Sequence, residues 1–193
     1  MNAYETWFCG TRFWRWITQR QVLPWILQGS ELGDHVLELG AGPGAATKEL
    51  GRLAPRVTSL EYDHAFAAKL GVRLNGSNAT AIQGDASTLP FADRTFSSAM
   101  AILMLHHLRS SDLQDRAFAE IWRVLRPGGV FLAAEIQDGW LHRVGHIKST
   151  FVPVMPASAL ARLTAVGFSK VTVDFRRGGY RIRALRAREC LSD

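Results

Sequence analysis

Short apolar runs alternate along the chain with stretches in which apolar residues recur at helical spacing. Apolar runs bounded by glycine, proline and polar residues are typical of buried strands, and strands that alternate with helices predict a mainly parallel sheet. The predicted strands cover residues 36–39, 57–61, 80–83, 97–103 and 130–135. The pattern therefore predicts an α/β fold.

The clearest predicted helix covers residues 112–125. Its apolar positions recur at helical spacing and are Leu113, Ala117, Ile121, Val124 and Leu125. Ser111 and Gln114 predict a capping box at its start, and the Pro-Gly-Gly sequence at 127–129 predicts its end. A shorter helix is expected over residues 45–53.

The last third of the chain has a different pattern. A helix is predicted over residues 158–166 and ends at Gly167, and two strands are predicted at 171–175 and 180–185. The connection between these strands, residues 176–179, is too short for a parallel crossover, so it predicts an antiparallel hairpin.

The composition is typical of a globular protein. Of the 193 residues, 47% are hydrophobic and 21% are charged. The longest strongly apolar run, residues 99–105, is far shorter than the ~20 residues that span a bilayer, and the N-terminus lacks the pattern of a signal peptide. Cys9 and Cys190 have neither metal-site nor disulfide-framework spacing. We therefore expect a cytoplasmic protein without a bound metal.

A net charge of +6 and a pI near 9.9 favour anionic partners. Much of the excess lies late in the chain, at Arg176, Arg177, Arg181, Arg183, Arg186 and Arg188. Within residues 180–184 arginines alternate with apolar residues, which predicts that they occupy the solvated face of a strand. Because no nucleic-acid-binding module accompanies the charge, nucleic acid is not the expected partner.

The first predicted strand runs directly into three glycines, Gly40, Gly42 and Gly44. Glycines permit a tight turn between strand and helix and let a ligand lie against the backbone. Their spacing fits the dinucleotide fingerprint, with Glu61 as the acid about 20 residues on. It fits the S-adenosylmethionine pattern E-x-G-x-G-x-G equally well, with Glu38 before the first glycine. The glycines alone leave both cofactors open.

Four blocks of sequence carry a resemblance to a known family. They are VLELGAGPGAAT (36–47), VTSLEYD (57–63), IQGDASTLPFADRTFSSAMAILMLHHL (82–108) and IWRVLRPGGVFLAAE (121–135). A weaker fifth block is LARLTAVGFSKVTV (160–173). In this order they resemble the class I S-adenosylmethionine-dependent methyltransferases, in the small subgroup without a large substrate insertion. The resemblance covers roughly residues 30–185.

This resemblance implies a Rossmann-like seven-stranded sheet of order 3-2-1-4-5-7-6, with strand 7 antiparallel and helices on both faces. The hairpin predicted from the short connection agrees with it. One position departs from the family pattern, since Ser97 stands where the family usually has Asp. That departure concerns local geometry near the pocket.

The implied cofactor is S-adenosylmethionine, which leaves as S-adenosylhomocysteine. The implied cofactor-binding residues are Glu38, Gly40, Ala41, Gly42, Gly44, Glu61, Tyr62, Asp85, Ala86, Ile102 and Leu103. Glu61, at the end of a strand, is expected to accept both ribose hydroxyl protons. Asp85 is expected to accept from the adenine amine, although Asp is also a common turn residue. Glu38 is expected at the methionine end, and Asp63 is expected to be an N-cap.

Methyl transfer is an in-line displacement, so positioning supplies much of the acceleration. A base is needed only where the acceptor arrives protonated. His106 and His107 follow the fourth predicted strand and are the candidate bases, with His107 favoured. A structural role for both histidines is the alternative.

The N-terminal residues 1–30 are rich in aromatic residues and arginine. The aromatic residues are Tyr4, Trp7, Phe8, Phe13, Trp14, Trp16 and Trp25, and the arginines are Arg12, Arg15 and Arg20. We expect a helical flap over the cofactor, with Tyr4 and Trp7 as lid contacts. Contact with an anionic membrane surface, which would suit a lipid- or quinone-like acceptor, is the alternative.

The remaining chain divides into a cofactor-binding core (31–136) and an acceptor-side segment with the terminal hairpin (137–193). Trp140, His142, His146 and Met155 are expected near the acceptor. The predicted function is methyl transfer to a small-molecule acceptor, including a lipophilic one. A NAD(P)-dependent oxidoreductase and a non-catalytic S-adenosylmethionine-binding module are the alternatives.

Overall fold

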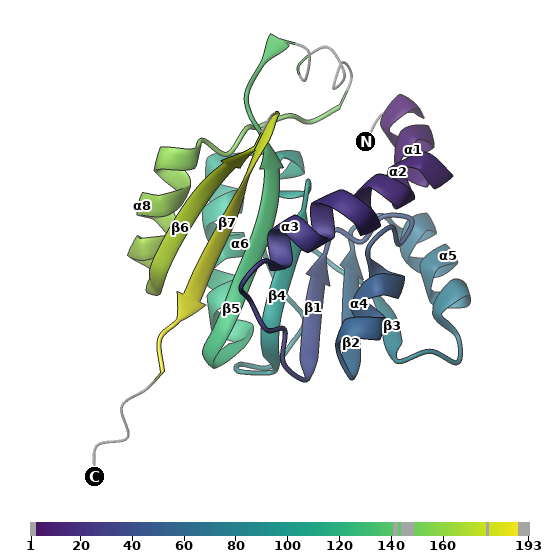
Figure 1. Cartoon of the computed structure of the whole chain (residues 1–193), viewed down its shortest axis with the longest axis horizontal. Helices are drawn as coiled ribbons and strands as arrows, with labels where there is room; N and C mark the ends of the chain where they lie inside the picture. Colours follow the sequence, from purple (N-terminus) through teal and green to yellow (C-terminus); the bar gives the residue numbers. More distant parts are fainter. Residues whose placement is uncertain (1–2, 141–142, 144–148, 177, 189–193) are drawn as a thin grey trace.

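One twisted sheet crosses the molecule, with helices on both faces (Figure 1). The computed structural model describes residues 3–140, 143, 149–176 and 178–188, and the side chains from residue 7 onward. The strands are β1 (His35–Leu39), β2 (Arg56–Glu61), β3 (Ala79–Gln83), β4 (Phe96–Ile102), β5 (Leu125–Ile136), β6 (Phe168–Arg176) and β7 (Gly179–Arg186). Within the described residues their order is β3-β2-β1-β4-β5-β7-β6.

The pairing of the strands confirms the expected sheet. β1 pairs in parallel with β2 and β4, and the β2–β3 and β4–β5 pairs are parallel as well. β7 runs antiparallel to both β5 and β6, so the terminal hairpin predicted from its short connection is confirmed.

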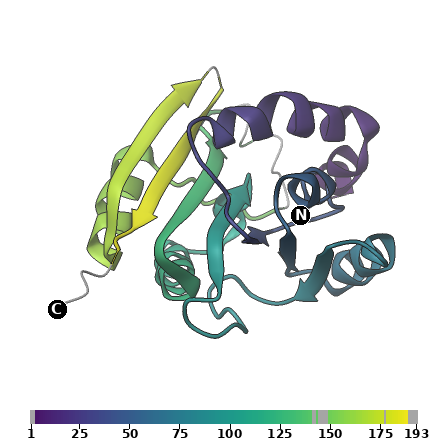
Figure 2. The same ribbon diagram turned by 60° about the horizontal axis from the view of Figure 1, so that its bottom comes forward.

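The helices divide between the two faces of the sheet. They are α1 (Ala3–Gly10), α2 (Arg12–Ile17), the π-helical turn η1 (Thr18–Val22), α3 (Leu23–Leu27), α4 (Thr47–Leu53), α5 (His64–Leu74), the 3₁₀ turn η2 (Leu105–His107), α6 (Ser111–Val124) and α8 (Pro156–Val166). α2, η1 and α3 form one continuous helix, which crosses the sheet on the face of α4 (Figure 2). α6 and α8 cover the opposite face (Figure 1).

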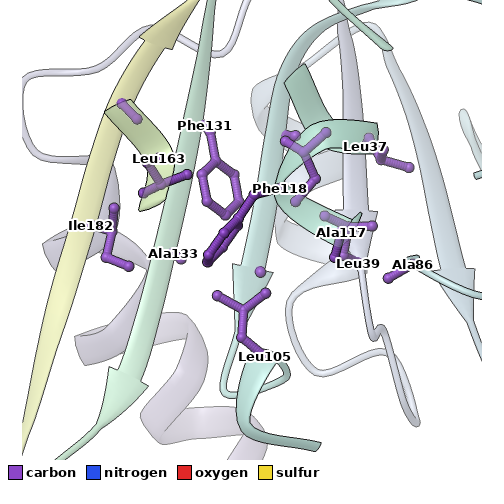
Figure 3. Close-up of a cluster of buried hydrophobic side chains, with 14 of the residues drawn as sticks. Leu37, Leu39, Ala86, Leu105, Ala117, Phe118, Phe131, Ala133, Leu163 and Ile182 are labelled. Atoms are coloured by element: carbon purple, nitrogen blue, oxygen red, sulfur yellow. The ribbon is translucent and has the colours of Figure 1, made fainter. Parts of the chain in front are cut away.

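Each face of the sheet packs on its own apolar cluster. Leu23 and Ile26 of α3 and Leu50 of α4 lie against Val36 and other residues of the central strands. On the other face Phe118 of α6 and Leu163 of α8 pack on Phe131 and Ile182, as Figure 3 shows. Because the central strands are covered on both faces, they read as continuous apolar runs.

The ends of several elements differ from the predictions. α6 is capped by Ser110, whose hydroxyl accepts from the Leu113 amide, so the predicted capping box of Ser111 and Gln114 is wrong. The Gln114 amide instead donates to the carbonyl groups of Leu105 and Val152. The buried Gln114 side chain thereby links α6 to the loops that contain these two carbonyl groups.

Two arginines of β7 form hydrogen bonds within the protein, although their positions in the strand predict exposure to solvent. Arg181 donates to the Trp25 carbonyl and to Asp174, and Arg183 donates to the Ser30 hydroxyl. The predicted alternation is confirmed, since Arg181 and Arg183 lie on the less buried side of β7, but the N-terminal helix and the loop after it cover part of this side. Arg177 lies outside the described residues.

Ser97 fills the position at which the family usually has Asp. Its hydroxyl oxygen accepts from the His35 amide at 2.9 Å and lies 2.8 Å from the Leu32 carbonyl oxygen and 2.9 Å from that of His35. Gly33 makes room for it, since a Cβ there would lie 2.6 Å from the Ser97 Cβ. A serine hydroxyl therefore fixes the start of β1.

Ser97→Ala is expected to destabilise the fold by about 1–2 kcal/mol, because it strips hydrogen bonds from a partly buried strand end. The neighbouring Ser98 is a matched control. Its hydroxyl is buried and has no hydrogen-bond partner among the described residues, so Ser98→Ala should change the free energy of unfolding by less than about 0.5 kcal/mol. Urea denaturation measures both. Equal losses for the two variants would contradict the assigned role of Ser97.

Candidate active site

A cavity of about 810 Å³ opens at the carboxyl ends of β1, β2 and β4. The chain leaves β1 toward β2 on one side and returns as β4 on the other, so the cavity lies where the strand order reverses. Such a switch point is the usual ligand site of an open α/β sheet. All of the predicted cofactor-binding residues except Gly44 line this cavity, together with His106 and His107.

Two of the three glycines bring backbone to the cavity. Gly40 has φ +69°, and a Cβ on it would lie 2.2 Å from the Met104 Cγ atom. Gly42 has φ +52° and open space beside it. Gly44 instead packs on α5, where a Cβ would lie 2.6 Å from a Leu70 methyl group. Gly40 and Gly42 therefore expose backbone to a ligand, and Gly44 serves packing.

Glu61 at the end of β2 is tied to the glycine loop. Its Oε2 atom accepts from the Gly42 amide at 2.6 Å, and its Oε1 atom accepts from the Asp63 amide at 3.0 Å. Each carboxylate oxygen has further lone-pair capacity, so the group can still accept from a pair of hydroxyls. Asp63 caps α5 by accepting from the Phe66 amide, which confirms its predicted role.

Glu38 is a buried acid beneath the loop. Its Oε2 atom accepts from the hydroxyl groups of Thr47 at 2.6 Å and Ser59 at 2.7 Å. Burial raises the pKa of Glu38 to about 7, against the effect of these two hydroxyls and with a contribution from the charge of Glu61. The side chain thus secures the first turn of α4 from within the core.

The predicted adenine region lies at the ends of β2 and β3. The Asp85 Oδ1 atom accepts from the Ser87 amide and hydroxyl, both at 2.8 Å, so Asp85 does form a turn. Its Oδ2 atom accepts no hydrogen bond from the described residues, and the side chain still lines the cavity. Tyr62 is 66% exposed at the rim, and Ala86 is buried in the wall.

The loop after β4 contains both histidines and is held by a buried acid. Glu135 at the end of β5 is 1% exposed, and its Oε1 atom accepts from the amides of Met104 and Leu105. Its Oε2 atom lies 2.5 Å from the His106 Nδ1 atom. A carboxylate can only accept, so this contact assigns a proton to Nδ1, and in that neutral tautomer the lone pair lies on Nε2.

His107 is held differently from His106. Its Nδ1 atom lies 3.2 Å from the Thr150 carbonyl oxygen, which again assigns the proton to Nδ1. His107 is half-buried, whereas His106 is 2% exposed. Leu103, just before the loop, adopts φ +51°, a left-handed conformation that is uncommon for leucine.

The N-terminal helices form part of the cavity wall through Phe8, Cys9, Trp14 and Thr18. Trp7 is 65% exposed and is not among the lining residues, and the side chain of Tyr4 lies outside the described part. His142 and His146 also lie outside the described residues. Within the described residues, no group of three or more His, Cys, Asp or Glu side chains is arranged to hold a metal ion.

Glu135 is the main residue that the sequence reasoning missed. The signal was present, because an acid at the carboxyl end of a parallel strand is what singled out Glu61. Composition assigned Phe8 and Trp14 to a flap, but it did not predict that their side chains face the cavity.

Glu38→Gln is expected to remove a pH dependence of stability. The pKa of Glu38 is about 7 in the folded chain against an ordinary 4.5, so between these values the folded chain keeps a proton that the unfolded chain has lost. The stabilisation is complete below about pH 4.5 and is lost as the pH rises through about 7, by roughly 3 kcal/mol. From about pH 5 to 8 the unfolding free energy of the wild type should therefore fall relative to Glu38→Gln.

The control for this experiment is Glu49→Gln, at a partly exposed glutamate of α4, which should keep the wild-type slope. Urea titrations at several pH values give the free energies. A gap between wild type and Glu38→Gln that stays constant with pH would contradict the assignment.

Comparison with known proteins identifies the family. The profile of the methyltransferase domain family matches residues 37–133. The demethylmenaquinone methyltransferase of Thermobifida fusca is 32% identical over 147 residues, which cover 69% of this chain and 58% of that protein. The ubiquinone/menaquinone biosynthesis C-methyltransferase of Hahella chejuensis is 32% identical over 114 residues, 55% of this chain and 45% of that protein. The chain thus spans about half the length of these curated relatives.

Solved structures share the fold. A Haloferax volcanii methyltransferase in complex with the Trm112 methyltransferase activator has a TM-score of 0.78 at 18% identity, with 97% of this chain and 99% of that chain covered. The PH0226 protein of Pyrococcus horikoshii has a TM-score of 0.77 at 18% identity, with 95% and 97% covered. The family match includes the glycine motif and the RVLRPGG block, so it decides against the dinucleotide interpretation of the glycines. The chain belongs to the class I S-adenosylmethionine-dependent methyltransferases.

Proposed function

We propose that this protein transfers the methyl group of S-adenosylmethionine to a small apolar acceptor that loses a proton in the reaction. The observation that carries the proposal is one continuous cavity with two kinds of wall. One wall is the Gly40–Gly42 backbone with Glu61. The other combines apolar side chains with His107 and with His106, which is held by Glu135. Relatives named as quinone-pathway methyltransferases support an acceptor of this kind.

The residues of the first wall fit the cofactor. In the proposed site the Glu61 carboxylate accepts from the ribose hydroxyls, and the Asp85 Oδ2 atom accepts from the adenine amine. Tyr62 flanks the adenine at the rim, while the backbone at Gly40 and Gly42 faces the methionine portion. Bound S-adenosylmethionine supplies an activated methyl group on a sulfonium centre.

The second wall suits an apolar acceptor. Its apolar members come from the N-terminal helices and from both sides of the histidine loop: Phe8, Trp14, Leu108, Leu113 and Ile136. Apolar walls exclude water from the reacting atoms, and a few polar groups among them set the orientation of the acceptor.

His106 is the proposed base. The acceptor atom would bond to the methyl carbon as the carbon–sulfur bond breaks and S-adenosylhomocysteine leaves. The proton of the acceptor would pass to the lone pair on the His106 Nε2 atom. The Glu135 carboxylate stabilises the resulting imidazolium through Nδ1, as an acid–histidine pair does in other enzymes. His107, which the sequence favoured, remains the alternative base, because its Nδ1–H also leaves the Nε2 lone pair for a proton.

Glu61→Gln is expected to weaken binding of S-adenosylhomocysteine by about 1–3 kcal/mol, because an NH₂ group that cannot accept replaces one of the two carboxylate oxygens. Isothermal titration measures the affinity. Glu49→Gln, which changes a glutamate outside the cavity, should bind as the wild type does. Equal affinities for all three proteins would remove Glu61 from the site.

His106→Gln and Glu135→Gln are expected to lower the rate of methyl transfer to phenols and short-chain hydroxynaphthoquinols by about 100-fold or more while the affinity for S-adenosylhomocysteine stays near wild type. The loss should shrink at alkaline pH, where the acceptor ionises without help. His107→Gln is the discriminating variant. If it alone lowers the rate, the base is His107.

Binding of S-adenosylhomocysteine without turnover on any acceptor of this class would instead favour the non-catalytic binding module.

A further inference from the structure

The helix that forms part of the cavity wall has a second, exposed face. Trp14 and Thr18 point to the cavity, but Phe13 and Trp16 are 60% and 52% exposed. The two exposed rings stack with their centroids 6.4 Å apart and an interplanar angle of 16°. Trp7 of α1 is 65% exposed as well. Burial in the core therefore does not account for the large aromatic side chains of Phe13 and Trp16.

Positive charge flanks these rings. Arg12, Arg15 and Arg20 are exposed, and none of the three forms an ion pair with another described residue. The helix over residues 12–27 contains no acidic residue at all. Some other exposed arginines do pair with acids, as Arg52 does with Glu49. The positive charge on α2 and η1 is therefore available to an external anion.

We propose that the exposed face of α2, defined by Phe13, Trp16 and their flanking arginines, docks on an anionic lipid bilayer. Tryptophan and phenylalanine rings favour the level of the lipid headgroups, and arginines beside them attract anionic headgroups. The helix lies on the outside of the molecule (Figures 1 and 2), so its rings can enter a deformable surface. No helix among the described residues is long and apolar enough to cross a bilayer, so the contact is peripheral.

The position of this surface links it to the cavity. Trp14 and Thr18 line the cavity, whereas Phe13 and Trp16 are exposed on the outer side of the same helix. One helix therefore presents one face to lipid and another to the cavity. An apolar acceptor dissolved in the bilayer would meet the protein at the helix that forms the cavity wall. This last step rests on the proposed function, whereas docking itself does not.

Sedimentation with vesicles tests the docking. The wild type should sediment with vesicles of phosphatidylglycerol and phosphatidylcholine, bind pure phosphatidylcholine vesicles at least tenfold more weakly, and lose binding as salt is raised. The double variant Phe13→Ser, Trp16→Ser should bind the anionic vesicles at least tenfold more weakly. Trp16→Phe should keep binding, and in brominated-lipid vesicles it should show less tryptophan quenching than the wild type.

Matched controls separate docking from general stickiness. Val72→Ser with Leu160→Ser removes two exposed apolar side chains elsewhere and should sediment as the wild type does. Arg12→Gln, Arg15→Gln, Arg20→Gln should weaken binding more than the equally charged control Arg56→Gln, Lys69→Gln, Arg116→Gln.

All variants should retain wild-type melting temperature and S-adenosylhomocysteine affinity, because every substituted side chain is exposed and outside the cavity. Absence of wild-type sedimentation, equal loss in the controls, or binding to single-stranded RNA in place of vesicles would overturn the proposal. Failure of methyl transfer with intact sedimentation would count against the proposed function alone.

Discussion

The loops that form the cavity are held by carboxylates at the ends of the strands. A backbone amide that leaves a strand in a buried region needs an acceptor, since an unpaired one costs as much as a lost hydrogen bond. Glu61 supplies that acceptor for Gly42, and Glu135 supplies it for Met104 and Leu105. Glu61 also lines the cavity, whereas Glu135 is buried and contacts the cavity-lining His106. A change in Glu61 would therefore alter the position of the glycine loop together with the charge of the site.

Periodicity and chemistry predicted the central fold well because the central strands are covered on both faces. The strands from β1 to β4 begin and end within one residue of the predicted positions. The hairpin followed from the length of one connection. The order of the strands, by contrast, came from the resemblance, because pairing between strands distant in sequence leaves no local pattern in either partner.

The sequence predicted those site residues that act through their own backbone, such as Gly42, or that stand at the end of a strand, such as Glu61. Glycine spacing could not separate Gly44, which packs on Leu70, from Gly42, which faces the cavity, since the difference depends on a helix 26 residues later. Glu135 was missed for a similar reason. Its partner His106 lies 29 positions earlier, and only the β4–β5 pairing brings the two together.

The sequence did not predict which residues of the N-terminal helix face the core, because the helix is irregular. The π-helical turn η1 lies between α2 and α3 and adds a residue to one turn, so apolar positions before and after it fall out of phase with a 3.6-residue repeat. Leu23 and Ile26 can therefore face the sheet while Trp14 and Thr18 face the cavity. In a regular helix of 3.6 residues per turn, Leu23 and Ile26 would point away from Trp14 and Thr18, whereas the extra residue of the π-helical turn brings all four to one side. The extra residue allows a single helix to anchor on the core at one end and reach over the cavity at the other, which leaves Phe13 and Trp16 outside.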